Sequence, residues 1–231
     1  MIPALLIWLT RKYGKRIKQF FSQRKLIVQL LVKSIFIPVI VVLLLLLTSL
    51  IAKSQVRQCE YKIVRNSDEI GKVKVEYVQD SNKFHVKVTS DIRFRVLFRF
   101  SAYIVEEALF SNSLLQYSSI YRKWNGSEKV NRQRKLSGSS YEVTNFGKSS
   151  TMPYYPVSFH ILQLYLKEPV NVQRVYSENH QKFFELQNVG ANTYKLILPD
   201  GDYNIYHYEH GICTKVDITH SFFNTSMVLQ K

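Results

Sequence analysis

Residues 72–88 read KVKVEYVQDSNKFHVKV, and this stretch decides the fold class. Val73, Val75 and Tyr77 alternate with charged residues, and this period of two is typical of a half-buried β-strand. The polar residues 79–82 then supply a turn signal, and the alternation resumes at Phe84. Two such runs joined by a short turn predict an antiparallel hairpin, so the sequence indicates a mainly β domain.

The same alternation continues from residue 57 to the end of the chain. The run Lys83–Phe110 exceeds the usual length of a strand, so we expect breaks near residues 90–91 and 99–101. Turn signals at Asn125-Gly126 and His210-Gly211 predict tight hairpins. We place the later strands at 114–124, 128–135, 139–145, 173–178, 182–188, 192–199, 203–209, 212–221 and 225–230.

One segment, Val157–Leu166, departs from the alternation and reads VSFHILQLYL. Its apolar spacing, with Pro156 before it and Pro169 after it, predicts one short helix, although its length leaves a strand as an alternative. Interruptions of a regular sheet often shape its open edge. We therefore place the candidate ligand-binding residues beside this segment, at Tyr165, Glu168, Glu178 and Asn179. In the alternative interpretation, Pro169 only ends the segment and Glu178 only stabilises a turn.

A membrane segment precedes the β domain. Residues 35–52 read IFIPVIVVLLLLLTSLIA, eighteen residues without a charge, and predict a hydrophobic N-terminal helix. This helix, within residues 35–54, is either a signal peptide cleaved after Ser54 or an uncleaved transmembrane anchor. In both cases residues 55–231 form an exported all-β domain in the periplasm or cell envelope. Residues 1–34 form a basic leader, unusually long for a signal peptide, which leaves a later start codon as an alternative.

The charge distribution argues against nucleic-acid binding. Residues 1–54 hold nine of the 32 basic residues and no acidic residue. The remaining residues carry 23 basic and 17 acidic groups, a net charge of only +6, whereas the whole chain carries +15. A nucleic-acid-binding domain requires a concentrated basic face on the folded part of the chain. We therefore expect the membrane, a lipid, a glycan or an envelope protein as partner, and no nucleic acid.

The exported part lacks the common catalytic motifs, such as a nucleophile elbow, a phosphate-binding loop or a zinc-binding helix motif. His207 and His210 point to opposite faces of a strand, which argues against a metal site. Adjacent Glu106 and Glu107 also diverge, and we expect them at the surface, with a position of one of them in the sheet interior as the alternative. We predict no catalytic residue, cofactor or metal.

Two further groups of residues leave alternatives open. Arg93, Arg95 and Arg99 should form a polar face, or a site for anionic headgroups or glycans, because alternation turns the neighbouring phenylalanines inward. Cys59 and Cys213 could pair in an oxidising compartment or remain small core residues.

The order of motifs in the last third resembles a known family. These motifs are Pro156-Val157-Ser158-Phe159, Leu164-Tyr165, Glu168-Pro169 and residues 175–179, with residues 61–64 and 70–71 upstream. Over residues 57–231 the chain resembles a family of uncharacterised exported β-rich bacterial proteins, a domain of unknown function. The resemblance implies an envelope location and an antiparallel meander that curls into a half-barrel or β-roll. It implies no activity.

From these observations we expect an exported, non-catalytic cell-envelope protein that binds an apolar or amphipathic ligand. The alternative is a membrane-anchored structural or scaffold partner of an envelope complex. An envelope enzyme would require carboxylates or histidines that converge only in the folded protein.

Overall fold

The structure is a computed structural model that describes residues 56–95, 99–220 and 223–230. Residues 54–231 form one compact unit. The basic leader and the hydrophobic segment 35–52 lie outside the described residues. Within the described ranges, no helix is long and apolar enough to cross a membrane.

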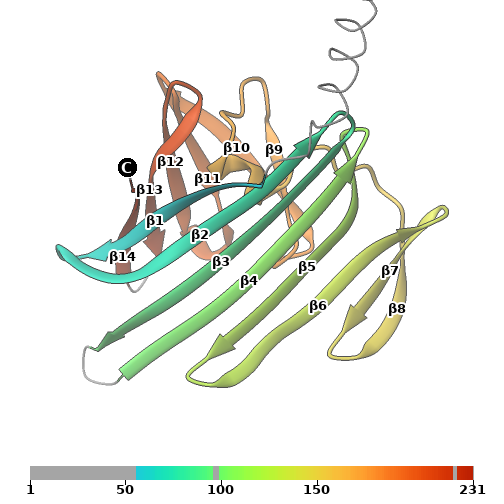
Figure 1. The fold of residues 1–231 in the computed structure, drawn as a ribbon, viewed down its shortest axis with the longest axis horizontal. Helices are drawn as coiled ribbons and strands as arrows, with labels where there is room; N and C mark the ends of the chain where they lie inside the picture. Colours follow the sequence, from blue (N-terminus) through green and yellow to red (C-terminus); the bar gives the residue numbers. More distant parts are fainter. Residues whose placement is uncertain (1–55, 96–98, 221–222, 231) are drawn as a thin grey trace, which may run out of the picture. The chain divides into compact units, whose positions relative to one another are not determined.

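Over the described residues, fourteen strands form one antiparallel sheet, which confirms the mainly β class that the alternation predicts (Figure 1). Two short 3₁₀ helices interrupt the strands, η1 (Ile161–Tyr165) and η2 (Pro199–Gly201). The strands are β1 (Arg57–Arg65), β2 (Asp68–Asp80), β3 (Lys83–Arg95), β4 (Arg99–Ser111), β5 (Leu114–Trp124), β6 (Ser127–Ser137), β7 (Ser140–Asn145), β8 (Lys148–Pro153), β9 (Arg174–Ser177), β10 (Lys182–Gly190), β11 (Thr193–Ile197), β12 (Tyr203–Glu209), β13 (Ile212–His220) and β14 (Phe223–Leu229).

The sheet is a meander in which the first and last strands meet. Each strand pairs with its neighbours in sequence, and β1 also pairs with β14 through Tyr61–Leu229 and Ile63–Met227. The two edges of the sheet are therefore β8 and β9, which lie in the middle of the chain. The sheet curls and stays open between these edges, which confirms the predicted half-barrel (Figure 1).

The predicted strands are mostly confirmed, with three corrections. No break occurs at residues 90–91, because β3 runs unbroken through Ser90 and pairs with β4 along its whole length. The sequence analysis missed β8, whose residues KSSTMP lack apolar alternation because nearly all of them are exposed at the sheet edge. The predicted helix is a single 3₁₀ turn over Ile161–Tyr165.

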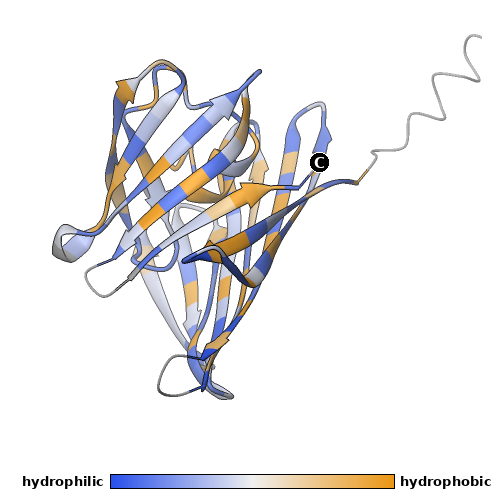
Figure 2. Cartoon of the chain, turned by 90° about the vertical axis from the view of Figure 1, so that its left-hand side faces the viewer, coloured by the Kyte–Doolittle hydropathy of each residue, from blue (hydrophilic) through white to orange (hydrophobic). Residues whose placement is uncertain are grey.

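Tight turns occur where the sequence predicts them. Asn125 and Gly126 adopt φ of 48° and 81°, and His210 and Gly211 adopt φ of 51° and 78°. Two successive residues with positive φ form the type of two-residue turn whose twist matches the twist of the two strands that it joins. Along the strands, hydrophilic and hydrophobic residues alternate, as Figure 2 shows.

The segment between β8 and β9, residues 154–173, fills the inside of the half-barrel. Its residues Val157, Leu162 and Leu164 are buried, and η1 contacts β3, β4, β9 and β13, which belong to both halves of the sheet. The segment is also held by its backbone, because Leu115 N donates to Val157 O over 2.9 Å. The core is therefore made by the sheet together with its own connecting segment.

Tyrosine hydroxyl groups secure this segment. The hydroxyl of Tyr208 donates to Leu164 O over 2.7 Å, and the hydroxyl of Tyr61 lies within hydrogen-bond distance of Tyr165 O and Cys213 O. Irregular backbone carries carbonyl groups that no strand partner satisfies, and each would cost free energy if it were buried alone. The tyrosines satisfy them and allow the segment to lie inside the sheet.

Candidate functional site

The 3₁₀ turn begins at a buried histidine. The backbone N–H of Leu162 donates to His160 Nδ1 over 3.2 Å, and the Gln163 side chain accepts from His160 N over 2.8 Å. Burial, and then the nearby Arg134 charge, lower the pKa of His160 to about 3. The ring is therefore neutral and can accept the hydrogen bond that starts the turn.

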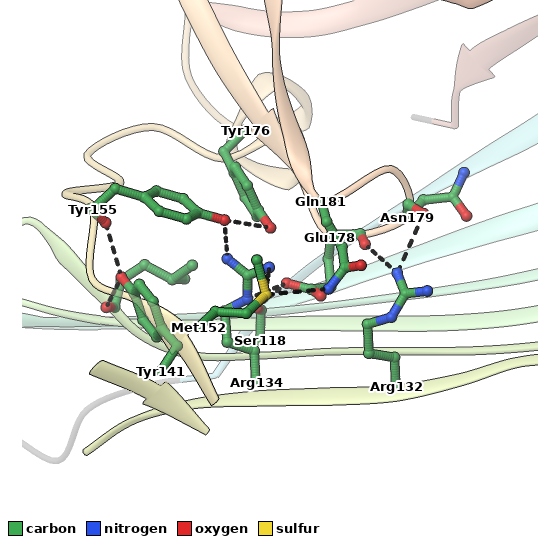
Figure 3. Close-up of polar contacts among 11 residues, drawn as sticks. Ser118, Arg132, Arg134, Tyr141, Met152, Tyr155, Tyr176, Glu178, Asn179 and Gln181 are labelled. Carbon is green, nitrogen blue, oxygen red and sulfur yellow. Dashed lines mark hydrogen bonds and ion pairs between the residues drawn. The ribbon is translucent and has the colours of Figure 1, made fainter. Parts of the chain in front are cut away.

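The candidate residues Glu178 and Asn179 lie at the turn between β9 and β10, and this turn packs against the inward face of β5 and β6 (Figure 3). The contact between them is polar. Ser118 Oγ donates to Glu178 Oε2 over 2.5 Å, and Arg134 Nε lies 3.4 Å from the same oxygen. The side chains of Arg134 and Glu178 are both 0% exposed. We call this contact the polar seam.

Strand register explains why these groups meet. Ser118 on β5 stands opposite Arg134 on β6, and Arg134 stands opposite Val143 on β7. Residues opposite each other in an antiparallel sheet point to the same face. Since Val143 is buried in the interior, Arg134 and Ser118 point inward with it and reach the β9–β10 turn.

Three tyrosines surround the Arg134 guanidinium. Its central carbon lies 4.9 Å from the ring centroid of Tyr176, 5.2 Å from that of Tyr141 and 5.4 Å from that of Tyr155. Arg134 Nη1 also donates to the hydroxyl of Tyr155. Aromatic faces attract a cation most strongly when the cation is shielded from water.

At the polar seam each charge favours the ionised form of the other, although desolvation still keeps the pKa of Glu178 above its usual value. Desolvation lowers the pKa of Arg134, but the Glu178 carboxylate and the tyrosine contacts outweigh it and raise the pKa overall. Desolvation raises the pKa of Glu178, and the Arg134 charge, the Ser118 hydrogen bond and the Arg132 charge oppose this rise. Each buried ion therefore depends on its partner.

A second arginine holds the backbone of the same turn. Arg132 Nη1 donates to Glu178 O over 3.0 Å and to Asn179 O over 3.4 Å. The Asn179 side chain lies 3.0 Å from His180 Nε2. Thus Asn179 lies at the surface end of the seam, while Glu178 lies at its buried end.

Tyr165 and Glu168 lie against other strands. The Tyr165 ring packs against Tyr61 and Tyr206, with centroids 5.7 and 6.3 Å apart. Glu168 Oε1 accepts from the hydroxyl of Tyr194 over 3.0 Å. The four candidate residues therefore form two separate pairs, one at the polar seam and one beside β11 and β12.

The expectation that Glu106 lies at the surface is wrong. Glu106 stands between Val88 and Ile120 on the inward face of the sheet and is half-buried. Desolvation raises its pKa to about 7, and Arg122 only partly opposes this effect. The curl of the sheet, which the local sequence does not encode, turns this face inward. Its neighbour Glu107 points outward as expected and lies 3.6 Å from Lys87.

The structure also places the arginines, histidines and cysteines that the sequence analysis discussed. Arg93, Arg95 and Arg99 are exposed, which confirms the predicted polar face. His207 Nε2 lies 2.8 Å from Asp217 Oδ2, and Cys59 and Cys213 are both free thiols. Across the described part of the chain, no three His, Cys, Asp or Glu residues are grouped to hold a metal ion.

The sequence analysis missed the arginines of the site. Arg132 and Arg134 lie two residues apart on β6 and therefore share one face of the strand, which is the inward one. The sequence contained one weak signal. Leu136, the next residue on the same face after Arg132 and Arg134, is apolar. Glu178, the partner of Arg134, lies far away in the sequence, so no local pattern indicated this ion pair.

A surface hollow of about 520 Å³ lies at the β9–β10 edge. It is lined by Gln173, Arg174, Glu185 and Leu186, none of which belongs to the polar seam. Arg174 and Glu185 stand opposite each other in the hairpin and are exposed. The residues that line this hollow are therefore distinct from the buried ionisable groups of the seam.

Comparison with known proteins gives a family but no activity. The profile of a family described as a domain of unknown function, DUF6134, matches residues 61–230 and agrees with the resemblance to an uncharacterised β-rich family. The chain is also similar to the solved structure of a β-barrel-like protein of the domain of unknown function DUF1849 from Brucella abortus. That similarity has 10% identity and a TM-score of 0.49, and it covers 78% of this chain and 97% of that chain. The comparison with curated proteins finds no match.

Proposed function

The chain belongs to the DUF6134 family of domains of unknown function, and from that premise we propose that it is an exported, non-catalytic structural or scaffold protein of the cell envelope. The apolar segment 35–52 supports this placement, because eighteen uncharged residues suit a lipid bilayer better than water. In this proposal the β domain lies beyond the membrane and acts through its outer surface.

One observation carries the proposal: the chain fills its own half-barrel. Proteins that carry apolar ligands keep a concave apolar cavity for them. Here Val157, Leu162 and Leu164 occupy the inner face of the sheet and are at most 3% exposed. This self-packing favours the scaffold role over the carrier of an apolar or amphipathic ligand.

The polar seam favours a non-catalytic role. A general acid or base must reach its substrate directly or through one water molecule. Glu178 is fully buried and is held by Ser118 and Arg134, so it is arranged to stabilise the fold.

Export is tested with the full chain carrying alkaline phosphatase after Lys231, since that enzyme is active only outside the cytoplasm. We expect an active fusion that stays with the membrane pellet after a carbonate wash. An inactive fusion would refute export, and release by the wash would refute the anchor but not export.

The filled interior is tested with residues 55–231, which correspond to the compact unit, and the apolar dye N-phenyl-1-naphthylamine. We expect no saturable dye binding to the wild-type domain. Leu164→Ala should bind benzene, a smaller apolar probe, because truncating a buried leucine opens an apolar cavity of about that size. One-to-one binding by the wild type would instead support the carrier function.

A further inference from the structure

Two inward-facing arginines lie side by side away from the fully buried seam. Arg122 on β5 pairs with Val130, and Arg132 on β6 pairs with Ile120, so the two arginines are diagonal neighbours on one face. Both are half-buried, so solvent reaches the inward face at this level. Diagonal neighbours in an antiparallel sheet are about 7–8 Å apart, within reach of two long side chains for a shared ligand.

The β9–β10 turn adds further basic groups. His180 and Lys182 are exposed and both contact Phe184, with the His180 ring centroid 5.0 Å and Lys182 Nζ 5.1 Å from the Phe184 centroid. Desolvation lowers the pKa of His180, and the positive charges of Lys182 and Arg122 lower it further. Arg122 therefore acts on His180 across the interior, from β5 to the turn. We call Arg122, Arg132, His180 and Lys182 the inward basic cluster.

These cations form no close ion pair, although the Glu106 carboxyl group acts on Arg122 and the Glu178 carboxyl group acts on Arg132. Over the described residues, neither Arg122, Arg132 nor Lys182 forms an ion pair with a carboxylate. Arg122 Nε is buried and makes no hydrogen bond there. A buried N–H donor without an acceptor is rare in native proteins, and a bound ligand is one way to satisfy it.

We propose that the inward basic cluster binds a phosphate-type oxyanion, either free phosphate or the phosphomonoester of a lipid headgroup. Arginine presents its N–H groups in a planar fork that matches two oxygens of such an anion. A tetrahedral dianion can accept hydrogen bonds from several directions, which suits donors that come from β5, β6 and the β9–β10 turn. This site is independent of the scaffold role.

Glu106 controls the charge of this site. It stands on the same face as Arg122, and the other groups that act on it are Glu178, Tyr165 and Tyr206. Because the pKa of Glu106 is raised to about 7, its negative charge is lost as the pH falls through neutrality. An oxyanion whose own charge stays constant should therefore bind more tightly at pH 6 than at pH 8.

The test uses the full chain in a neutral detergent and isothermal titration with inorganic phosphate at constant ionic strength. We expect saturable one-to-one binding that Arg122→Gln weakens about tenfold or more, as expected for loss of a charge-assisted hydrogen bond. Arg95→Gln is the matched control, because Arg95 is exposed near the end of β3 and should leave binding unchanged. No saturable binding, or equal loss in both variants, would overturn the proposal.

A fluorescence readout distinguishes local binding from a folding defect. Trp8 and Trp124 are the two tryptophans of the chain, and Arg122 lies 5.7 Å from the ring centroid of Trp124. In a Trp8→Phe background, phosphate should change the Trp124 emission. The Arg122→Gln variant should keep the wild-type far-ultraviolet circular dichroism spectrum, which shows that it folds, and lose the fluorescence response to phosphate.

Two further arms define the ligand. Soluble dihexanoyl phosphatidate carries a phosphomonoester, so tighter binding than phosphate indicates a lipid headgroup and equal or weaker binding indicates free phosphate.

Sulfate, whose charge is constant between pH 6 and 8, tests the role of Glu106. Wild-type affinity for sulfate should fall several-fold across this range, and Glu106→Gln should keep the higher affinity throughout. A pH dependence that persists in Glu106→Gln would refute this role.

Discussion

Two regions of the half-barrel interior are stabilised in different ways. Around η1 the interior is apolar, and tyrosine hydroxyls satisfy the few buried carbonyls of Leu164 and Tyr165. Around the β9–β10 turn the interior contains a buried ion pair, Arg134 and Glu178, enclosed by aromatic rings. Apolar packing tolerates small losses in proportion to volume, whereas a buried ion pair fails as a unit when one partner is removed. The comparison predicts where the domain is most sensitive to substitution.

The largest effect is expected for Glu178→Ala. The substitution leaves the Arg134 charge buried without its counterion, which costs about 3–5 kcal/mol in the free energy of unfolding. Urea denaturation of the domain measures this loss. Glu107→Ala is the matched control, because it removes a partly exposed ion pair with Lys87 and should cost less than about 1 kcal/mol. Equal losses of stability in the two variants would contradict a stabilising role of the buried ion pair.

Leu164→Ala should come next. Leu164 lies in the segment of residues 154–173 and is 0% exposed, and truncating a buried leucine costs about 3 kcal/mol, with a range set by how far the cavity collapses. The same denaturation experiment applies, with Val170→Ala, at an exposed site on the same segment, as control. If Leu164→Ala lowered the free energy of unfolding no more than Val170→Ala does, the segment would not form part of the core.

The third prediction concerns pH and Glu106. Its pKa is 4.5 in the reference state and about 7 in the folded protein, so the folded protein holds this proton more tightly. Stability from this group is therefore complete below pH 4.5 and is lost as the pH rises to about 7. After discounting for partial exposure, we expect a loss of about 1–2 kcal/mol.

Comparison with Glu106→Gln isolates this contribution, because the other titrating groups are shared by both proteins. The difference in unfolding free energy between the variant and the wild type should grow from pH 4.5 to pH 7. A constant difference across this window would show that the carboxyl group is not desolvated.

The smallest effect is expected for Tyr208→Phe. This change removes the hydrogen bond to Leu164 O and costs about 1 kcal/mol, somewhat more if the carbonyl remains unsatisfied. Tyr103→Phe is the control, because Tyr103 is 43% exposed and should change stability little. Thermal denaturation resolves the two variants, and equal melting temperatures would argue against a role for the hydroxyl.

Much of the sheet could be predicted because its signal is local. Alternation identified the strands around residues 72–88, and the turn residues identified the hairpins at Asn125 and His210. The extra break predicted within β3 was wrong because typical strand lengths do not apply to a long, twisted sheet that pairs on both sides. β8 was missed because an exposed edge strand requires no apolar alternation.

The sequence by itself determined the β class, the hairpin positions and the outward face of Arg93, Arg95 and Arg99, since each depends on residues close together in the chain. Only the tertiary structure decided that β1 pairs with β14, that residues 154–173 fill the interior, and that Arg134 meets Glu178. Period-two patterning tells which residues share a face of a strand. It does not tell how the sheet curls, and the curl decides which distant side chains share the interior.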